Sequence, residues 1–423
     1  MKIAILADLH LNRSTYKGVT DKIEFPGLPF RSADFMRAFR WSVQECLRIR
    51  PDMVVIAGDV YDYYDPNNEV RGFFSSCLKE LNAAQIPIFI LTGNHDVCMK
   101  HHGLTDIEKL GLKNIQVYAD IAVKTWKEKG HNFMFFPYSL NIERGIKTFR
   151  QEFADLLKKA KEKANDLPTI FFGHFPVYGA AMNQFVKEDE EEESDKPKKY
   201  FNYDHDNIGA KELNKLKELG VTHVFLGDFH EFQVIDGLDA KMVGMYGGSL
   251  EKNSFNENGL EKGFILYDDT VPMDPKTGHA RRVLYPNVRP MKEIKGNLES
   301  IRKQMKEIDY SKYQGAILRI TFEGSRDELN PFLYEYDSIK AELVEKTDAI
   351  HVLYKQVVAR DEQSETEARK LEKEIKDTGH ISDRDVINEV NQMTVEDNKD
   401  KTEQEEIIKI AEEIYKETIE DIS

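Results

Sequence analysis

The chain carries five short apolar runs, and each is followed within a few residues by Asp, His or Asn. Runs of four to eight residues rich in Val, Ile and Phe are typical of buried strands. A single such junction could arise by chance, but five in order are difficult to attribute to chance. The runs and the polar residues after them are 2–7 with Asp8 and His10, 53–57 with Asp59, 86–91 with Asn94, His95 and Asp96, 169–172 with His174, and 221–226 with Asp228 and His230.

Helical periodicity between the first runs predicts an α/β fold. Apolar residues recur at helical spacing over 35–47, with Ser32 as the expected N-cap, and again over about 67–84. Each helix would connect two parallel strands. The second has an apolar face wide enough either for core packing or for a dimer contact. Ligands bind at the carboxyl ends of such strands, so we expect the polar residues to meet there.

The rest of the chain predicts further parts. Residues 117–140 alternate as in a second sheet, and 149–163 form an amphipathic helix. The acidic and then basic stretch 187–199 is interpreted as a solvated insert rather than a regulatory or substrate-guiding flap. Residues 291–358 predict a small α+β domain whose second helix starts with Asn330 as cap and Pro331 as first residue. The expected domains are 1–272, 285–358 and a charged linker with a terminal amphipathic helix over 360–423, which would dock on its own domain or on a partner.

Composition narrows the class of protein. A length of 423 residues exceeds one ordinary core, and the formal charge of −16 argues against nonspecific adhesion to nucleic acid. It does not exclude a nucleic-acid enzyme, because bound divalent cations make a carboxylate site locally positive. No apolar run approaches the 18 residues of a membrane span, and no signal peptide is expected. Three scattered cysteines favour a reducing compartment, so we expect an intracellular, cytoplasmic protein.

The polar residues at the strand ends form a set of metal-ligand types. Carboxylates, imidazoles and an amide without thiolates suit manganese, iron or zinc. Any single His would more often be a core or capping residue, but the joint set is too large for one ion. It suits two ions about 3.5–4 Å apart that share a carboxylate, and Asp59 at a central strand end is the expected bridge. The candidate ligands are Asp8, His10, Asp59, Asn94, His174, Asp228 and His230.

Two further groups complete the candidate site. His95 follows a metal-ligand residue and is free to give a proton to a leaving oxygen, with Asp96 as the group that orients its imidazole. We expect the substrate to be contacted by Asn12, Arg13 or Lys17 in the loop after His10, and by Asp62. A solvated loop is an equal alternative for residues 12–30.

These motifs resemble a known family. The sequences around Asp8-x-His10, Gly58-Asp59, Gly93-Asn94-His95-Asp96, Gly173-His174 and Gly227-x-x-His230 are similar to those of the calcineurin-like metallophosphoesterases. Within that superfamily the chain resembles the SbcD-type DNA nucleases of double-strand-break repair. Three other features of that group are Gly248-Ser249-Leu250-Glu251 with Ser254-Phe255-Asn256-Glu257 and Lys262-Gly263-Phe264, the entry Val288-Arg289-Pro290 into a small domain, and the helical tail.

The resemblance implies a fold, an activity and partners. The fold would be an α/β four-layered αββα sandwich with a small α+β capping domain that binds DNA and a helical C-terminal tail. The activity would be manganese-dependent hydrolysis of DNA, as a 3′ to 5′ exonuclease and a single-strand or hairpin endonuclease in repair, recombination or replication. The partners would be a second copy, paired through residues 67–111, and an SbcC-type coiled-coil ATPase bound by the C-terminal helices. One manganese would be held by Asp8, His10, Asp59 and His230, and the other by Asp59, Asn94, His174 and Asp228.

Two departures from the family pattern leave alternatives open. Asp228 stands where the family usually has His, and Asp62 where the nucleases often have a second catalytic His. A phosphatase or phosphodiesterase acting on small or protein substrates is one alternative. Tyr63 and Tyr64 after Asp62 depart from the Asp-Arg-Gly pattern of protein phosphatases. A weakly active scaffold that holds DNA ends is the other.

Overall fold

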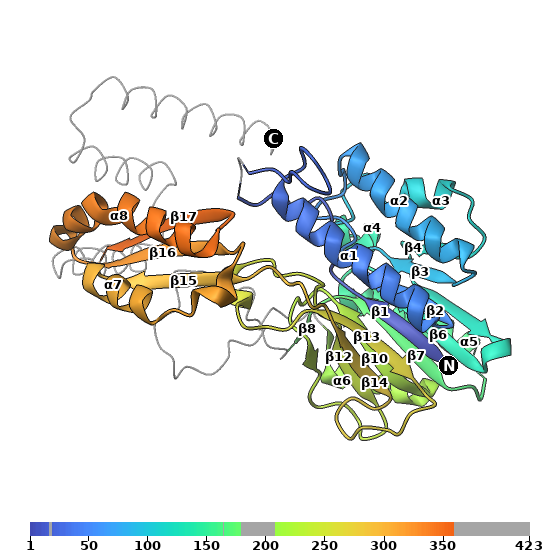
Figure 1. The fold of residues 1–423 in the computed structure, drawn as a ribbon. Coiled ribbons are helices and arrows are strands. Elements are labelled where there is room, and N and C mark those ends of the chain that lie inside the picture. The colour runs from blue at the N-terminus through green and yellow to red at the C-terminus, as the bar shows by residue number, and fades with distance from the viewer. Residues whose placement is uncertain (17–18, 164, 179–207, 359–423) are drawn as a thin grey trace, which may run out of the picture. The chain divides into compact units, whose positions relative to one another are not determined.

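The computed structural model describes residues 1–16, 19–163, 165–178 and 208–358 (Figure 1). The predictions for Lys17, for the charged stretch 187–199 and for the linker and helix over 360–423 lie outside these residues. In the described part of the chain, no helix combines the length and the apolar character needed to cross a bilayer.

The first sheet has six strands in the order β14-β13-β1-β2-β3-β4. Strands β1 to β4 are parallel, and β13 and β14 are added antiparallel at one edge. The runs predicted at 2–7, 53–57 and 86–91 are its β1, β2 and β3. The bounds are β1 Lys2–Leu6, α1 Phe30–Ile49, β2 Met53–Ala57, α2 Asn68–Ala83, β3 Ile88–Leu91, α3 Thr105–Lys109, β4 Ile115–Tyr118, β13 Gly263–Asp268 and β14 Ala280–Leu284.

The second sheet also has six strands, in the order β11-β12-β10-β7-β6-β5. Its four central strands are parallel, while β5 and β11 are antiparallel edges. The bounds are β5 Ala122–Trp126, η1 Lys127–Lys129, β6 His131–Phe136, α4 Leu140–Glu143, α5 Phe149–Glu162, β7 Thr169–His174, β8 Val177–Tyr178, β9 Ile208–Gly209, α6 Ala210–Leu213, η4 Asn214–Leu219, β10 Val221–Gly227, β11 Gln233–Val234, β12 Val243–Tyr246 and η5 Phe255–Glu257.

The two sheets pack face to face between two layers of helices. Alternate residues of β1 show the layering, since Ile3 and Ile5 face the second sheet while Ala4 and Leu6 face α1 and α2. On the other side, Phe171 of β7 packs with residues of α5 and α6. Burial on both faces explains why these parallel strands are continuously apolar. The predicted four-layered sandwich is confirmed.

Two predicted helix starts are wrong, the first at α1 and the second at the helix predicted to begin at Pro331. Helix α1 begins at Phe30, two residues before Ser32, and its N-cap Pro29 makes no side-chain capping bond. The Ser32 hydroxyl instead donates to the carbonyl oxygen of Arg13 at 2.7 Å, so a tertiary contact displaced the local capping role. The apolar face of α2 is buried in the chain's own core, which favours the packing interpretation.

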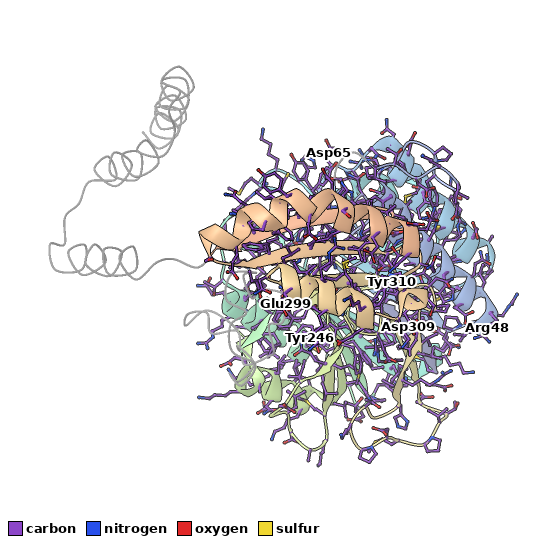
Figure 2. The ribbon with its side chains drawn as sticks, turned by 60° about the vertical axis from the view of Figure 1, so that its left-hand side comes forward. Arg48, Asp65, Tyr246, Glu299, Asp309 and Tyr310 are labelled. Carbon is purple, nitrogen blue, oxygen red and sulfur yellow. The ribbon has the colours of Figure 1, made fainter. Side chains whose placement is uncertain are left out.

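A third, three-stranded sheet in the order β15-β16-β17 lies within the segment predicted as a small α+β domain. Its second helix, α8, starts at Arg326 and contains Pro331, because Ser325 and Glu328 form the starting pair instead of Asn330. Figure 2 shows the side chains here, with Glu299 on α7 and Tyr310 in the turn after it labelled. The role of this segment as a DNA-binding cap stays a prediction. The bounds are β15 Met291–Gly296, α7 Leu298–Glu307, η6 Tyr310–Tyr313, β16 Ile317–Gly324, α8 Arg326–Thr347 and β17 His351–Val358.

One compact unit contains Met1–Thr321 and Leu333–Lys355. The described residues outside it are Phe322–Phe332 and 356–358, which belong to a second unit. All of the candidate site residues lie in the first unit.

Candidate metal centre

The predicted ligands lie at the carboxyl ends of strands from both sheets. Asp8 and Asp59 follow β1 and β2, His174 ends β7, and Asp228 follows β10. Asp8, His10, Asp59 and His174 are at most 2% exposed. Several of them lie in turns with positive φ, a conformation that non-glycine residues adopt rarely and that is found repeatedly at active sites. The positive-φ candidates are Asp8, His10, Asn12, Asp59 and Asp228.

Asp59 lies between two groups of donors. Its Oδ2 atom is 3.7 Å from Nε2 of His10, and its Oδ1 atom is 3.4 Å from Nε2 of His174. Asp59 also belongs to both described sets of residues that can hold a metal ion, one with His10 and His95 and one with Asp8 and His174. A carboxylate with one oxygen toward each set has the geometry expected of a bridge between two cations.

Two of the imidazoles present Nε2 to the site because their Nδ1 atoms donate hydrogen bonds to the protein. Nδ1 of His174 donates to the carbonyl oxygen of Ala57 at 2.8 Å, and Nδ1 of His230 donates to Oε1 of Glu257 at 3.1 Å. Nδ1 of His10 lies 3.3 Å from Oδ1 of Asp62, close enough for attraction, but it makes no hydrogen bond to the residues that the structure describes. Such outer contacts fix the tautomer of a metal-binding histidine.

Potential metal-ligand atoms converge at two places in this arrangement. Nε2 of His10 and Nε2 of His230 are 3.0 Å apart, and Nε2 of His174 is 3.0 Å from Oδ1 of Asn94. Two acceptors at that distance repel each other unless a proton or a cation lies between them. In addition, buried Oδ2 of Asp8 accepts no hydrogen bond from the residues that the structure describes. These observations fit divalent cations with nitrogen and oxygen ligands.

The electrostatics support the same interpretation. Burial raises the pKa of Asp8 well above its usual range and that of Asp228 to about 6. Burial would also raise the pKa of Asp59, but His174 outweighs it and holds that pKa below its usual range. Burial lowers the pKa of His10 to about 4. Three neighbouring carboxylates are costly to keep charged together, and bound cations would offset that cost.

Glycines allow the strands and loops to approach closely here. A Cβ atom on Gly93 would be 2.1 Å from Oδ1 of Asp59, and one on Gly58 would be 2.1 Å from Nδ1 of His174. A Cβ on Gly227 would be 2.1 Å from the carbonyl oxygen of Ala57, the group that holds His174. The glycines of the motifs therefore leave the room that the candidate ligands occupy.

The structure places His95 at the site but gives Asp96 a different role. Nδ1 of His95 donates to the carbonyl oxygen of Asp62 at 2.7 Å, and the His95 ring lies 4.8 Å from that of His10. The Asp96 carboxylate instead accepts backbone N–H groups of Val60, Tyr61 and Gly93. It braces two loops and does not orient the imidazole, because a nearer carbonyl already occupies Nδ1.

The three described substrate-contact candidates are engaged with other residues. Asp62 bonds to Arg13, whose Nη1 donates to Oδ1 of Asp62 at 2.7 Å, and it also contacts His10. Oδ1 of Asn12 accepts from Nδ2 of Asn67, which also caps α2. Asn12 is therefore part of the scaffold, whereas the Arg13–Asp62 pair lies beside His10.

Glu257 and Lys262 belong to motifs of the resemblance, but the sequence did not predict a role for either one at the site, where both contact His230. Glu257 accepts from Nδ1 of His230 and from Nζ of Lys262. The available signal was a lysine directly before an apolar run, since Lys262 precedes β13 and is 1% exposed. A lysine that enters a buried strand needs an anionic partner nearby.

Comparison with known proteins identifies the family. The calcineurin-like phosphoesterase family matches residues 1–232, more than half of the chain. The chain belongs to this family. The matched region contains all of the candidate ligands from Asp8 to His230, together with the strands that they follow or end. The family-level resemblance predicted from the motifs is thereby confirmed, and divalent metal ions are the cofactors of metallophosphoesterases.

Named relatives of this phosphoesterase include DNA repair proteins. It is 24% identical over 356 residues to the DNA double-strand break repair protein Mre11 of Methanosarcina acetivorans, covering 82% of this chain and 50% of that protein. It is 24% identical over 275 residues to the SbcD component of the nuclease SbcCD of Staphylococcus epidermidis, covering 60% and 64%. The chain thus spans about half the length of the first relative. The alignment with the structure of a dimetal phosphatase from Danio rerio covers 63% of this chain and 91% of that protein, with 13% sequence identity and a TM-score of 0.37.

Proposed function

We propose that the protein is a two-metal, manganese-dependent DNA nuclease that works with an SbcC-type ATPase. The observation that carries the proposal is Asp59, whose two carboxylate oxygens each face a different imidazole. The names of the Mre11 and SbcD relatives supply the DNA substrate class. The resemblance to SbcD-type nucleases implies a dimer and an ATPase partner, and the predicted partner-binding helix lies outside the described residues.

The residues present fit two divalent ions. One would be held by Asp8, His10, Asp59 and His230, and the other by Asp59, Asn94, His174 and Asp228. When bound, two such ions acidify a water molecule and neutralise negative charge on a phosphate. Asp228 in place of an imidazole adds negative charge and should shift the metal preference.

His95 is the proposed proton donor to the leaving oxygen. Its Nδ1 is committed to the carbonyl of Asp62, so Nε2 is the atom left to exchange a proton with substrate. The same residue also lies in a possible metal-ligand set with His10 and Asp59. These two roles differ in one measurable respect, because only a ligand contributes to metal affinity.

Arg13 is the proposed substrate-facing cation. Its guanidinium is held by Asp62, which also contacts His10, so its charge lies next to one candidate metal position. A guanidinium can pair with a phosphate of the DNA strand. Asp62 would then serve as a positioning residue in place of the second catalytic imidazole.

The test is hydrolysis by the purified full chain with manganese. Substrates are single-stranded DNA with each end labelled, a DNA hairpin, and bis-p-nitrophenyl phosphate. His95→Ala should lower DNA hydrolysis by about 100-fold or more while manganese affinity, measured by calorimetry, is unchanged. His131→Ala is the control, because His131 starts β6 at the opposite strand end from the candidate ligands.

Each outcome selects one function. DNA cleavage that needs manganese and His95 supports the nuclease, and the labelled ends report polarity. Hydrolysis of the small diester alone supports a small-substrate phosphodiesterase. DNA binding without turnover supports a scaffold and refutes the nuclease.

A further inference from the structure

We propose that Glu257 and Lys262 form a buried clamp that fixes the position and tautomer of His230. Both would be positioning residues, since neither reaches the converging Nε2 atoms. The inference rests on the proposed function, because His230 is a candidate ligand there. It adds two residues to the machinery and specifies what they do.

The clamp is a closed ring of hydrogen bonds. Nδ1 of His230 donates to Oε1 of Glu257 at 3.1 Å, and Nζ of Lys262 donates to Oε2 of Glu257 at 2.5 Å. Nζ of Lys262 also donates to the backbone carbonyl oxygen of His230 at 2.9 Å. The ring and the backbone of His230 are thus tied to the same ion pair.

The remaining hydrogen-bonding capacity of the pair is also used within the protein. Nζ of Lys262 donates to Oγ of Ser249 at 3.0 Å, which accounts for the third ammonium proton. Oε2 of Glu257 accepts the backbone N–H of Asn253 at 3.1 Å. Ser249 also donates its backbone N–H to the His230 carbonyl. The clamp is therefore anchored to the loop that runs from 248 to 257.

Burial indicates what such a pair is for. Glu257 and Lys262 are each only 1% exposed. The Glu257 carboxylate accepts from the Lys262 ammonium and from the backbone N–H of Asn253, and both bonds favour its charged form. A buried ion pair adds little or no stability over an apolar pair of the same size. Placement of His230 is a role that an apolar pair could not supply.

The tautomer has a direct consequence for metal binding. A charged carboxylate is an acceptor only, so Nδ1 of His230 carries the proton and Nε2 presents a lone pair. That lone pair faces Nε2 of His10 at 3.0 Å. In the other tautomer a proton on Nε2 would occupy the position of the cation.

The first experiment reads the tautomer without metal. Imidazole nitrogens of the ¹⁵N-labelled full chain are observed by long-range ¹H–¹⁵N correlation after removal of metal with EDTA, and His230→Gln assigns the His230 signals. We expect the Nδ1–H tautomer. An Nε2–H tautomer in the wild-type protein would overturn the inference, and no substitution in the clamp is needed to learn this.

The second experiment compares two double variants by manganese calorimetry. Glu257→Gln with Lys262→Met removes both buried charges but keeps an acceptor for Nδ1, while Glu257→Leu with Lys262→Met removes the acceptor as well. We expect manganese affinity within about threefold of wild type for the first and about 10–100-fold weaker for the second. Glu293→Gln, which removes a carboxylate bonded to Arg319 and Thr321, is the control and should bind as wild type.

The outcomes separate this inference from the proposed function. If the wild-type protein binds no manganese, the proposed metal centre fails, while the tautomer measurement still tests the clamp. If the two double variants bind manganese equally well, the clamp is refuted and the metal centre stands.

Discussion

Substitution of Gly93 by Ala should disable the candidate metal centre through one methyl group. The added Cβ would lie 2.1 Å from Oδ1 of Asp59 and 2.3 Å from its backbone nitrogen. An ordinary contact begins at 3.4 Å, so the shared carboxylate must move by more than 1 Å. Rotation of the side chain cannot relieve the clash, because the backbone nitrogen is also too close. The φ of Gly93 is not left-handed, so the backbone itself would accept Ala.

The expected loss can be estimated from that displacement. A misplacement of about 1 Å at a reacting centre costs about 100-fold in rate. We therefore expect Gly93→Ala to lower kcat/KM for manganese-dependent hydrolysis of bis-p-nitrophenyl phosphate by about that factor, with weaker manganese binding by calorimetry. The bond from the His95 backbone N–H to Oδ1 of Asp59 would be lost as well.

Gly72 supplies a matched control. It is an exposed residue within α2, and a Cβ there would meet nothing within 4 Å. Gly72→Ala should leave hydrolysis unchanged and stabilise the fold by about 0.5–1 kcal/mol, because Gly is unfavourable inside a helix. Near-UV circular dichroism of both variants shows whether the fold is intact. Folded Gly93→Ala protein with wild-type kcat/KM would refute the steric argument.

Other predictions follow from the structure. Burial lowers the pKa of His223 to about 4. Below pH 6.5 the unfolded chain therefore binds a proton at this histidine that the folded chain does not bind. The free energy of unfolding should fall by about 3 kcal/mol between pH 6.5 and 4. In the His223→Phe variant, the free energy of unfolding, measured with urea in the presence of EDTA, should not show this decline. An unchanged dependence of that free energy on pH would contradict the prediction. Asp62→Asn should weaken manganese binding by about 10-fold or more, because Nδ1 of His10 would no longer lie next to a carboxylate. A manganese affinity equal to that of the wild type, measured by calorimetry, would show that Asp62 does not position His10. Asp228→His should change the relative activity with manganese and zinc, and identical metal preference would show that Asp228 is not a ligand.

The sequence predicted the strands well because their burial is two-sided. The run over 53–57 is the strand Met53–Ala57, and Val54 and Val55 pack on opposite faces of the same sheet. Local sequence signals were less reliable at helix starts, because a capping side chain can instead hydrogen-bond to a residue from another part of the chain. Ser32 is the example, since its hydroxyl is taken by Arg13 of a preceding loop. The convergence of the polar residues followed from parallel strands ending at one edge.

The orientation of the site residues could not be predicted from the sequence. The acceptor for Nδ1 of His174 is the carbonyl of Ala57, 117 residues away, and the acceptor for His230 is 27 residues away. No local pattern predicts such pairings, because they depend on how the two sheets and the loop after β12 are placed. For the same reason the role expected of Asp96 passed to a main-chain carbonyl.

The left-handed turns that carry Asp8, His10 and Asp59 have an evolutionary consequence. A non-glycine residue in that conformation costs the folded state on the order of 1 kcal/mol, and Gly would adopt it freely. Laboratory selection for heat tolerance alone would therefore favour changes such as Asp59→Gly, which relax the backbone and discard the donor. Variants selected for thermostability should be assayed for turnover at every round, because the substitutions that most simply stabilise these turns remove the candidate ligands.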